Sequence, residues 1–408
     1  MSSIKNKNAL LQDRWQDVMQ NNYGTPDLAV SKGRGNYLFG VDGRKYLDLI
    51  GGIATNIIGH SHRNVVKAIS KQAKTLDHTS NLYIHDAGLK LAEKLRELTG
   101  SEEVQVFFAN SGAEVNEAAF KIARLTGKER VIATSGGFHG RTIGALSLTG
   151  QNAKREPFKP LLKKIDFVPF NDLTALEFQL IENNKNTAAF IVEPIQGENG
   201  VVVPSDGYLA NARKLTEKYG ALLIIDSVQT GMGRTGTWFG YESEKITPDV
   251  VTLAKGLGGG LPMGAMLVFP SVKNKFTPGS HGSTFGGNPI CSAAALATIK
   301  EIENHQYLHW AIQMENKIKS QIGKISGISQ VRGKGLLIGI GFEHPIAKKI
   351  QSKLRYEGIL VGVSNDYLIR IAPPLTIKNK EIDRFALTLQ QILARESKLS
   401  NLKVNANA

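Results

Sequence analysis

Short apolar runs alternate with helix-like segments through the middle of the chain. The strand-like runs cover residues 104–109, 130–134, 188–192, 221–225, 250–254 and 265–269. Between them, the spacing of apolar residues is typical of helices at 114–126, 173–183 and 206–219. Gly220 comes after the last of these helices, at the place of a helix C-cap. This alternation predicts a mainly parallel sheet that is covered on both faces.

The two ends of the chain have a different pattern. Residues 8–21 are typical of a short amphipathic helix, and two strand-like runs flank the Asp42-Gly43 pair, which favours a hairpin. Strand and helix patterns return near 331–342, 346–357 and 381–395. We therefore expect an α/β protein with four parts: residues 1–60 as part of a small domain, 61–305 as a large domain, 306–397 as a smaller α+β domain, and 398–408 as a polar tail that frays.

Composition narrows the class of protein. Hydrophobic residues make up 41% and charged residues 21% of the 408 residues, which is ordinary for a globular protein. Cys291 is the only cysteine, so no disulfide can form within the chain, as suits a reducing compartment. There is no apolar run of about 20 residues, and the polar N-terminus lacks the apolar core of a signal peptide. We expect a cytoplasmic protein without a membrane partner.

The net charge of +14 raises the question of nucleic-acid binding. The basic clusters are only pairs, such as Lys163 with Lys164 and Lys348 with Lys349, and no basic arm or aromatic–basic repeat occurs. Dispersed, solvated lysines explain the charge better, and we expect no nucleic-acid partner.

Three chemical groups come directly after three of the predicted strands. Asn110-Ser111-Gly112-Ala113-Glu114 comes after 104–109, Asp226 after 221–225, and Lys255 after 250–254. Ligands bind beyond the carboxyl ends of the strands in open α/β sheets. A helix N-terminus, an acid and a lysine should therefore meet at one edge of the sheet.

Each group alone has an ordinary alternative. Ser111 and Glu114 form a capping box, which can simply start a helix. Lys255 could extend its ammonium to water from a strand end, and Asp226 could cap a helix or bind a metal. Together they match pyridoxal phosphate (PLP), which requires an anion site, a lysine that condenses with its aldehyde, and a carboxylate beside its ring nitrogen.

Other cofactors fit less well. The glycine run at 256–260 does not match G-x-G-x-x-G because Leu261 stands where the last glycine should be, and there is no G-x-x-x-x-G-K-[ST] segment. The histidines His60, His62, His139 and His281 lie in separate motifs without the paired spacing of zinc ligands. We expect neither a nucleotide site nor a metal.

At these residues the chain resembles the class III (ω-amino acid) aminotransferases of the type I PLP-dependent transferase fold. The resemblance runs from about Tyr23 to Leu375, through VDGRKYLDLIGGIATNIIGHSH, NSGAEVNEAAFKIAR, GGFHGRT, VEPIQGENGVVVP, DSVQTGMGRTG, TLAKGLGGGLPMG and IRIAPPL. Within the class, YGTP, HTSNLY and GSHGSTFGGNP are most similar to members that act on N-acetylornithine in arginine biosynthesis.

The resemblance implies a role for each residue of the cofactor site. Lys255 would bind PLP covalently and later move a proton, and Asp226 would pair with the ring nitrogen. The resemblance further implies that Phe138 and Val228 sandwich the ring, that Gln229 hydrogen-bonds its phenolic oxygen, and that Ser111, Gly112 and Ala113 hold the phosphate. Thr284 would reach the phosphate from a second subunit, which implies a homodimer with shared active sites.

The resemblance also implies a substrate site. Arg141 would bind the α-carboxylate of the donor, and Glu193 would be an acid near the cofactor. Glu198 would pair with Arg370 while the donor is bound and release it to 2-oxoglutarate. Tyr23 and Ser283 would add contacts to the substrate. The alternatives are a surface arginine at Arg141 and a structural ion pair between Glu198 and Arg370.

Some positions depart from the pattern of the family. Ser227 stands where a glutamate is usual, and Arg63 replaces a proline in GHxHP. Since successive strand residues face opposite ways, we expect Ser227 to point away from the cofactor beside Asp226. We expect Arg63 to alter a turn near the dimer interface.

The predicted reaction is a ping-pong transamination of N-acetylornithine with 2-oxoglutarate, which gives N-acetylglutamate semialdehyde and glutamate. Ornithine, 4-aminobutyrate or succinyl-diaminopimelate as donor are the alternatives within the class. Ornithine-specific members tend to carry a tyrosine near Ile53, which weakens that alternative. A PLP-binding transcriptional regulator is a further alternative, but no helix-turn-helix segment precedes the predicted fold.

Overall fold

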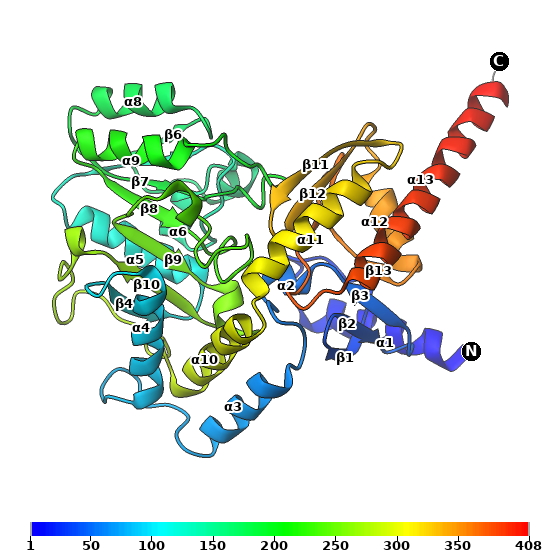
Figure 1. Cartoon of the computed structure of the whole chain (residues 1–408), viewed down its shortest axis with the longest axis horizontal. Helices are drawn as coiled ribbons and strands as arrows, with labels where there is room; N and C mark the ends of the chain where they lie inside the picture. Colours follow the sequence, from blue (N-terminus) through cyan, green and yellow to red (C-terminus); the bar gives the residue numbers. More distant parts are fainter. Residues whose placement is uncertain (1, 407–408) are drawn as a thin grey trace.

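The computed structural model describes residues 2–406, with the side chains of 7–397. Within this range the strands form three sheets, one of seven strands and two of four. Figure 1 shows the large sheet and its helices on one side of the molecule and the two small sheets on the other, with α11 between them. No helix of the described residues is long and apolar enough to cross a membrane.

The large sheet has the order β4-β10-β9-β8-β7-β5-β6. Only β10 runs opposite to its neighbours β4 and β9, so the other strands all point the same way. The mainly parallel sheet predicted from the sequence is confirmed. Its strands are β4 (Gln105–Ala109), β5 (Arg130–Thr134), β6 (Ile165–Val168), β7 (Thr187–Val192), β8 (Leu222–Asp226), β9 (Val250–Leu253) and β10 (Gly264–Val268).

Helices cover both faces of this sheet, as its side chains require. In β7, Phe190 and Val192 pack into one apolar cluster while Ala189 and Ile191 pack into another. Alternate residues of a strand face opposite ways, so a strand that is buried on both sides is apolar throughout. The surrounding helices are α3 (Arg63–Ala73), α4 (Asp86–Thr99), α5 (Gly112–Arg124), α6 (Ile143–Leu148), α7 (Asn152–Arg155), α8 (Leu173–Glu182), α9 (Tyr208–Lys218) and α10 (Pro289–Asn304). Short 3-10 turns are η1 (Glu156–Phe158), η2 (Glu242–Glu244), η3 (Lys255–Gly258) and η4 (Pro270–Val272).

The two ends of the chain share the small sheets. The expected hairpin forms, and its second strand pairs with a strand from near residue 360, in the order β1-β2-β3-β13. The other small sheet has the order β11-β12-β15-β14. The strands are β1 (Val30–Arg34), β2 (Tyr37–Gly40), β3 (Lys45–Asp48), β11 (Ile328–Lys334), β12 (Leu337–Phe342), β13 (Ile359–Leu360), β14 (Gly362–Asn365) and β15 (Leu368–Ile371), and the helices are α1 (Ser2–Val18), α2 (Gly51–Ala54), α11 (Tyr307–Ile322), α12 (Ala347–Tyr356) and α13 (Asn379–Ala406).

Some bounds differ from the prediction. The N-terminal helix spans Ser2–Val18 instead of 8–21, and β6 was not expected. The backbone of α13 continues as a helix to Ala406, so the tail expected at 398–408 does not begin at 398 in the described backbone. Once a packed segment has nucleated a helix, each further residue adds one backbone hydrogen bond, so the helix can extend beyond the packed part.

Candidate active site

A cavity of about 460 Å³ opens where the parallel strands of the large sheet end. Ser111, Gly112 and Ala113 line it at the start of α5, and Asp226, Val228 and Gln229 line it after β8. Lys255 reaches it from η3, directly after β9 and Ala254. The convergence of a helix N-terminus, an acid and a lysine, which the order of strands predicted, is thus present in the fold. Phe138, Arg141 and Glu193 also line the cavity.

The N-terminus of α5 is built as a capped anion site. Ser111 is the N-cap and accepts a hydrogen bond from the backbone N–H of Glu114, while the Glu114 carboxylate returns to the N–H of Asn110. A Cβ atom on Gly112 would lie 2.8 Å from Cγ1 of Val228, so only glycine fits there without displacing Val228. The free backbone N–H groups and the dipole of α5 suit a phosphate.

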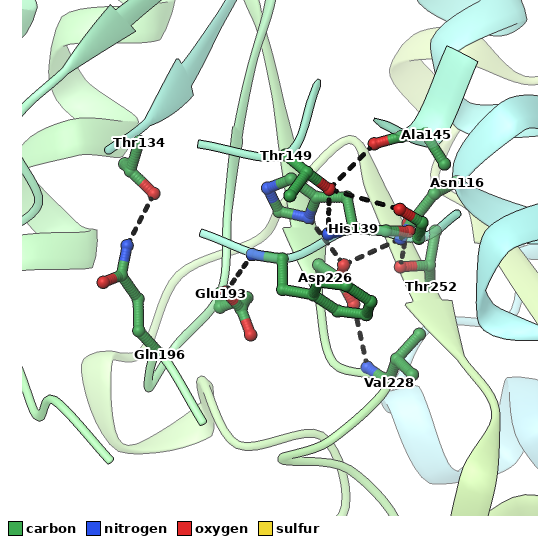
Figure 2. Close-up of polar contacts among 12 residues, drawn as sticks. Asn116, Thr134, His139, Ala145, Thr149, Glu193, Gln196, Asp226, Val228 and Thr252 are labelled. Carbon is green, nitrogen blue, oxygen red and sulfur yellow. Dashed lines mark hydrogen bonds and ion pairs between the residues drawn. The ribbon is translucent and has the colours of Figure 1, made fainter. Parts of the chain in front are cut away.

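Asp226 is buried at the centre of a hydrogen-bond network (Figure 2). Its Oδ2 atom lies 2.7 Å from Nδ1 of His139 and 2.8 Å from Nδ2 of Asn116, and its Oδ1 atom accepts the N–H of Val228 at 3.0 Å. Asn116 is held in turn by Thr252, whose hydroxyl donates to its side-chain oxygen. These contacts hold the carboxylate in one orientation facing the cavity.

His139 and Glu193 complete this buried network. Burial alone would lower the pKa of His139, but the hydrogen bond and charge of Asp226 outweigh it, and the pKa is raised. Burial raises the pKa of Glu193 to about 8, against the lowering effect of His139. The Glu193 carboxyl accepts the backbone N–H of Phe138 at 3.0 Å and carries a proton at neutral pH for much of the time.

Lys255 is held in an environment that favours its neutral amine. Burial lowers the pKa of Lys255 to about 8, although Glu198 acts to raise it. Its backbone has a φ of 42°, in the left-handed region that residues with side chains seldom adopt. Such strained residues cluster at functional sites.

Glu198 and Arg370 form an ion pair beside the cavity. Nη1 of Arg370 lies 2.7 Å from Oε1 of Glu198 and also donates to the carbonyl of Gly197 and to Oε1 of Gln229. Gln229 donates to Glu198 as well, so it joins the pair to the cavity wall. Burial would raise the pKa of Glu198, but Arg370 and Lys255 hold it at about 2.

The remaining predicted residues lie at the rim or outside the cavity. Cζ of Arg141 lies 5.7 Å from the centre of the Phe138 ring, and the side chain is exposed. Ser283 and Thr284 line a neighbouring pocket instead, where Ser283 accepts the backbone N–H of Gly286. Tyr23 is 80% exposed and does not line the cavity.

Sequence reasoning missed the groups that support Asp226. From the sequence, His139 was considered only as a possible metal ligand, and no role was predicted for Asn116. The two residues stand 87 and 110 positions from Asp226 in the chain, so only the fold brings them together. The one available signal for His139 was its place next to Phe138 in FHGRT. Nowhere in the described chain do three or more His, Cys, Asp or Glu side chains gather as a metal site.

Ser227 departs from the family pattern without entering the cavity. It is buried, and its hydroxyl donates to the carbonyl of Phe239, away from Asp226. Arg63 is the first residue of α3, the position of a helix at which proline is most readily accepted. Proline and arginine at this position leave the same hydrogen bonds within the helix, because the first N–H groups of a helix have no partner inside it.

The donor set of this cavity fits PLP. A capped helix N-terminus suits the phosphate, Asp226 suits a protonated ring nitrogen, and Lys255 supplies an amine that is about half neutral near pH 8. The aromatic face of Phe138 and the methyl groups of Val228 line the cavity between these ends. Fold and site together define an enzyme of the PLP-dependent transferase class.

Comparison with known proteins agrees with this class. The family model "Aminotransferase class-III" matches residues 18–393. The chain is 48% identical over 398 residues to the acetylornithine aminotransferase of Mycobacterium tuberculosis, covering 97% of this chain and 99% of that one. It is 49% identical over 385 residues to the enzyme of the same name from Mycolicibacterium smegmatis, covering 94% and 98%. Among solved structures, the ornithine aminotransferase of Toxoplasma gondii is similar, with 31% identity, a TM-score of 0.89 and 95% of each chain covered. The chain belongs to the class III aminotransferases, and it is a PLP-dependent aminotransferase.

Proposed function

We propose that this enzyme transfers the δ-amine of N-acetylornithine to 2-oxoglutarate, giving N-acetylglutamate semialdehyde and glutamate, in arginine biosynthesis. The names of the relatives at 48% and 49% identity support this donor. The observation that carries the proposal is the pairing of Glu198 with Arg370 next to the cavity that Arg141 and Lys255 line. This arrangement offers one free and one masked arginine to two different substrates.

Arg141 is the free arginine. It lies at the mouth of the cavity, and among the described residues no carboxylate comes within ion-pair distance of it. A guanidinium of this kind binds a carboxylate through two parallel hydrogen bonds. With the donor α-carboxylate at Arg141, the far amine of the donor points toward Lys255 at the other end of the cavity.

Arg370 is the masked arginine. While Glu198 neutralises it, a substrate with only one carboxylate binds at Arg141 alone. When 2-oxoglutarate enters, its second carboxylate competes for Arg370, and Glu198 moves aside. In this way a single site accepts both a monocarboxylate donor and a dicarboxylate acceptor. Gln229 hydrogen-bonds both Glu198 and Arg370, the two residues that would separate.

The cofactor, when bound, serves as the electron sink that makes a carbon–hydrogen bond of the substrate acidic. The side chains of the protein hold and orient it. Asp226 keeps the ring nitrogen protonated, and Ser111, Gly112 and Ala113 bind the phosphate through the start of α5. Phe138, Val228 and Gln229 line the cavity and would hold the ring, and Glu193 would be a nearby acid.

Lys255 has two roles in this proposal. Its neutral amine would hold the cofactor, and the same amine would accept and return the proton of the substrate. A pKa of about 8 suits both roles, since such an amine accepts a proton readily and also releases it near neutral pH.

The proposal includes a homodimer. Thr284 would contact the phosphate in the site of the second subunit, and Ser283 and Tyr23 would contact the substrate. Support comes from the exposure of Leu82, Tyr83 and Ile84, a run of large apolar side chains that a partner would cover. We also propose that the enzyme works in the cytoplasm, where the buried free thiol of Cys291 would stay reduced.

A panel of amino donors tests the proposed function. Glutamate formation from 2-oxoglutarate would be measured with N-acetylornithine, succinyl-diaminopimelate, ornithine and 4-aminobutyrate, with Lys255→Ala as the inactive control. We expect the highest kcat/KM with N-acetylornithine. A higher value with another donor would leave the class III assignment in place and reject this donor.

A further inference from the structure

Lys154 is a third cation close to the active-site cavity, beside Phe138, which lines that cavity. It lies on α7, and its Nζ atom is 5.1 Å from the centre of the Phe138 ring. Cζ of Arg141 is 5.7 Å from the same ring centre. One aromatic ring that lines the cavity thus lies close to both cations, and the charge of Arg141 acts on Lys154.

The surroundings of Lys154 are short of negative charge. The side chain is half-buried, and no carboxylate of the described residues lies within ion-pair distance of it. Its ammonium donates a hydrogen bond to the side-chain oxygen of Gln151 and lies over the Phe138 ring. Burial lowers the pKa of Lys154, and Arg141 and Arg370 lower it further, against the raising effect of Glu198.

The two nearby carboxyl groups do not balance these charges. Glu198 is already paired with Arg370. Burial raises the pKa of Glu193 to about 8, so that carboxyl is largely protonated at neutral pH. The end of the cavity that receives the donor carboxylate is therefore positively charged beyond what that carboxylate needs.

We propose that Lys154 is a specificity-determining residue that selects amino donors with an acylated α-amine. This inference rests on the proposed function, because it places the donor α-carboxylate at Arg141. The α-nitrogen of the donor then lies next to both cations. An amide there is neutral, and its carbonyl oxygen accepts a charge-assisted hydrogen bond from Lys154.

A donor with a free α-amine would meet the opposite situation. Its α-ammonium would add a positive charge beside Arg141 and Lys154, in a half-buried place where like charges repel strongly. Discrimination between N-acetylornithine and ornithine thus has an attractive part and a repulsive part, and Lys154 supplies both.

The test compares two donors in three variants. Lys154→Met removes the charge and keeps much of the length, Lys154→Arg keeps the charge, and Lys159→Met is the matched control. Lys159 is an exposed lysine nearby that pairs with Glu156 and has no contact with Phe138. For each enzyme, kcat/KM is measured with N-acetylornithine and with ornithine.

We expect Lys154→Met to lower kcat/KM for N-acetylornithine about tenfold, as befits the loss of one charge-assisted hydrogen bond, and to raise or preserve kcat/KM for ornithine. The ratio of the two donors should return toward the wild-type value in Lys154→Arg and stay unchanged in Lys159→Met. Calorimetric binding of N-acetylnorvaline, which lacks the reacting amine, should weaken by a similar factor in Lys154→Met.

Two results would overturn the inference, and they differ. If wild-type enzyme favours N-acetylornithine and Lys154→Met keeps that preference with both donors reduced equally, Lys154 only supports Phe138 and the inference alone fails. If wild-type enzyme itself shows no preference for acylated donors, the proposed function fails and the inference fails with it.

Discussion

At the scale of single residues, this site depends on how burial and neighbouring charges set the protonation of a few groups. The same burial that favours a neutral Lys255 also favours a protonated Glu193, whereas Arg370 keeps Glu198 ionised. The carboxyl groups of these two glutamates thus carry different charges at neutral pH, because Glu198 lies beside a guanidinium whereas Glu193 is fully buried. These differences lead to two predictions.

The first concerns the reactivity of Lys255 in protein stripped of cofactor. An amine reacts with an acylating reagent only in its neutral form, and the pKa of Lys255 is lowered to about 8. Its labelling, measured by peptide mass spectrometry, should therefore rise with pH with a midpoint near 8, while exposed lysines react appreciably only at higher pH. Lys255→Ala should lose the low-pH label. A midpoint near the usual lysine value would refute the lowered pKa.

The second concerns the ion pair between Glu198 and Arg370. Glu198→Gln removes the charge that masks Arg370, so Arg370 becomes free to bind dicarboxylates at all times. We expect the KM for 2-oxoglutarate to fall about tenfold and glutamate to compete better with the donor. Glu177→Gln, which breaks a more exposed pair with Lys218, is the control. An unchanged KM would indicate that the pair is structural.

At the scale of elements, the site depends on the short segments that leave the carboxyl ends of the strands. Helix α5 begins with a capping box directly after β4, and η3 begins at Lys255, with only Ala254 between it and the end of β9. The start of α3 tolerates different residue types, since Arg63 is its first residue where relatives are expected to have proline. The N-terminus of α5 is less tolerant because Gly112 packs against Val228.

Gly112→Ala tests the close packing of this helix start. The added methyl group would lie within 2.8 Å of Val228 and push it into the space proposed for the cofactor. Alanine also stabilises a helix relative to glycine by up to about 1 kcal/mol, so the fold itself should persist. We expect the Kd for PLP, measured by fluorescence titration, to increase about tenfold, with little change in the melting temperature of the cofactor-free protein. Unchanged PLP affinity would contradict the role of this contact.

At the scale of the whole molecule, a single chain leaves part of the proposed site unfilled. Thr284 and Ser283 line a neighbouring pocket and not the cavity that Lys255 lines. The side chains of Leu82, Tyr83 and Ile84 are 72% to 86% exposed, which is unusual for three neighbouring apolar residues. The second copy of the chain in the proposed homodimer would account for both observations.

Complementation between two inactive variants tests this arrangement. Lys255→Ala lacks the reacting amine, and Thr284→Asp places a negative charge against the phosphate of the neighbouring site. Each homodimer should be inactive, but refolding an equal mixture should restore about a quarter of the wild-type activity, because half of the dimers are hybrids with one intact site. No recovery, together with a solution mass near the 44.4 kDa of one chain, would reject the shared site.

The sequence by itself determined the local features of this protein. Apolar runs and their spacing predicted the strands of the large sheet except β6, and the helices α5, α8 and α9. The residues after those strands predicted Ser111, Asp226 and Lys255 at one edge, because parallel strands end at the same side. The resemblance of the motifs predicted the class III family. The short strands from β13 to β15 and the antiparallel β10 had no periodic signal long enough to predict their pairing.

Only the tertiary structure decided the environment of those residues. The contacts of Asp226 with His139 and Asn116 and the approach of Lys154 to Phe138 join segments whose local sequences do not predict the contact. The ion pair between Glu198 and Arg370, 172 positions apart, was implied by the family resemblance and not by the local pattern. The charge of each group depends on its burial and on its neighbours in space, and the local sequence pattern predicts neither. Residue types therefore identified the chemistry, while the fold determined which of those residues are charged and what each of them can reach.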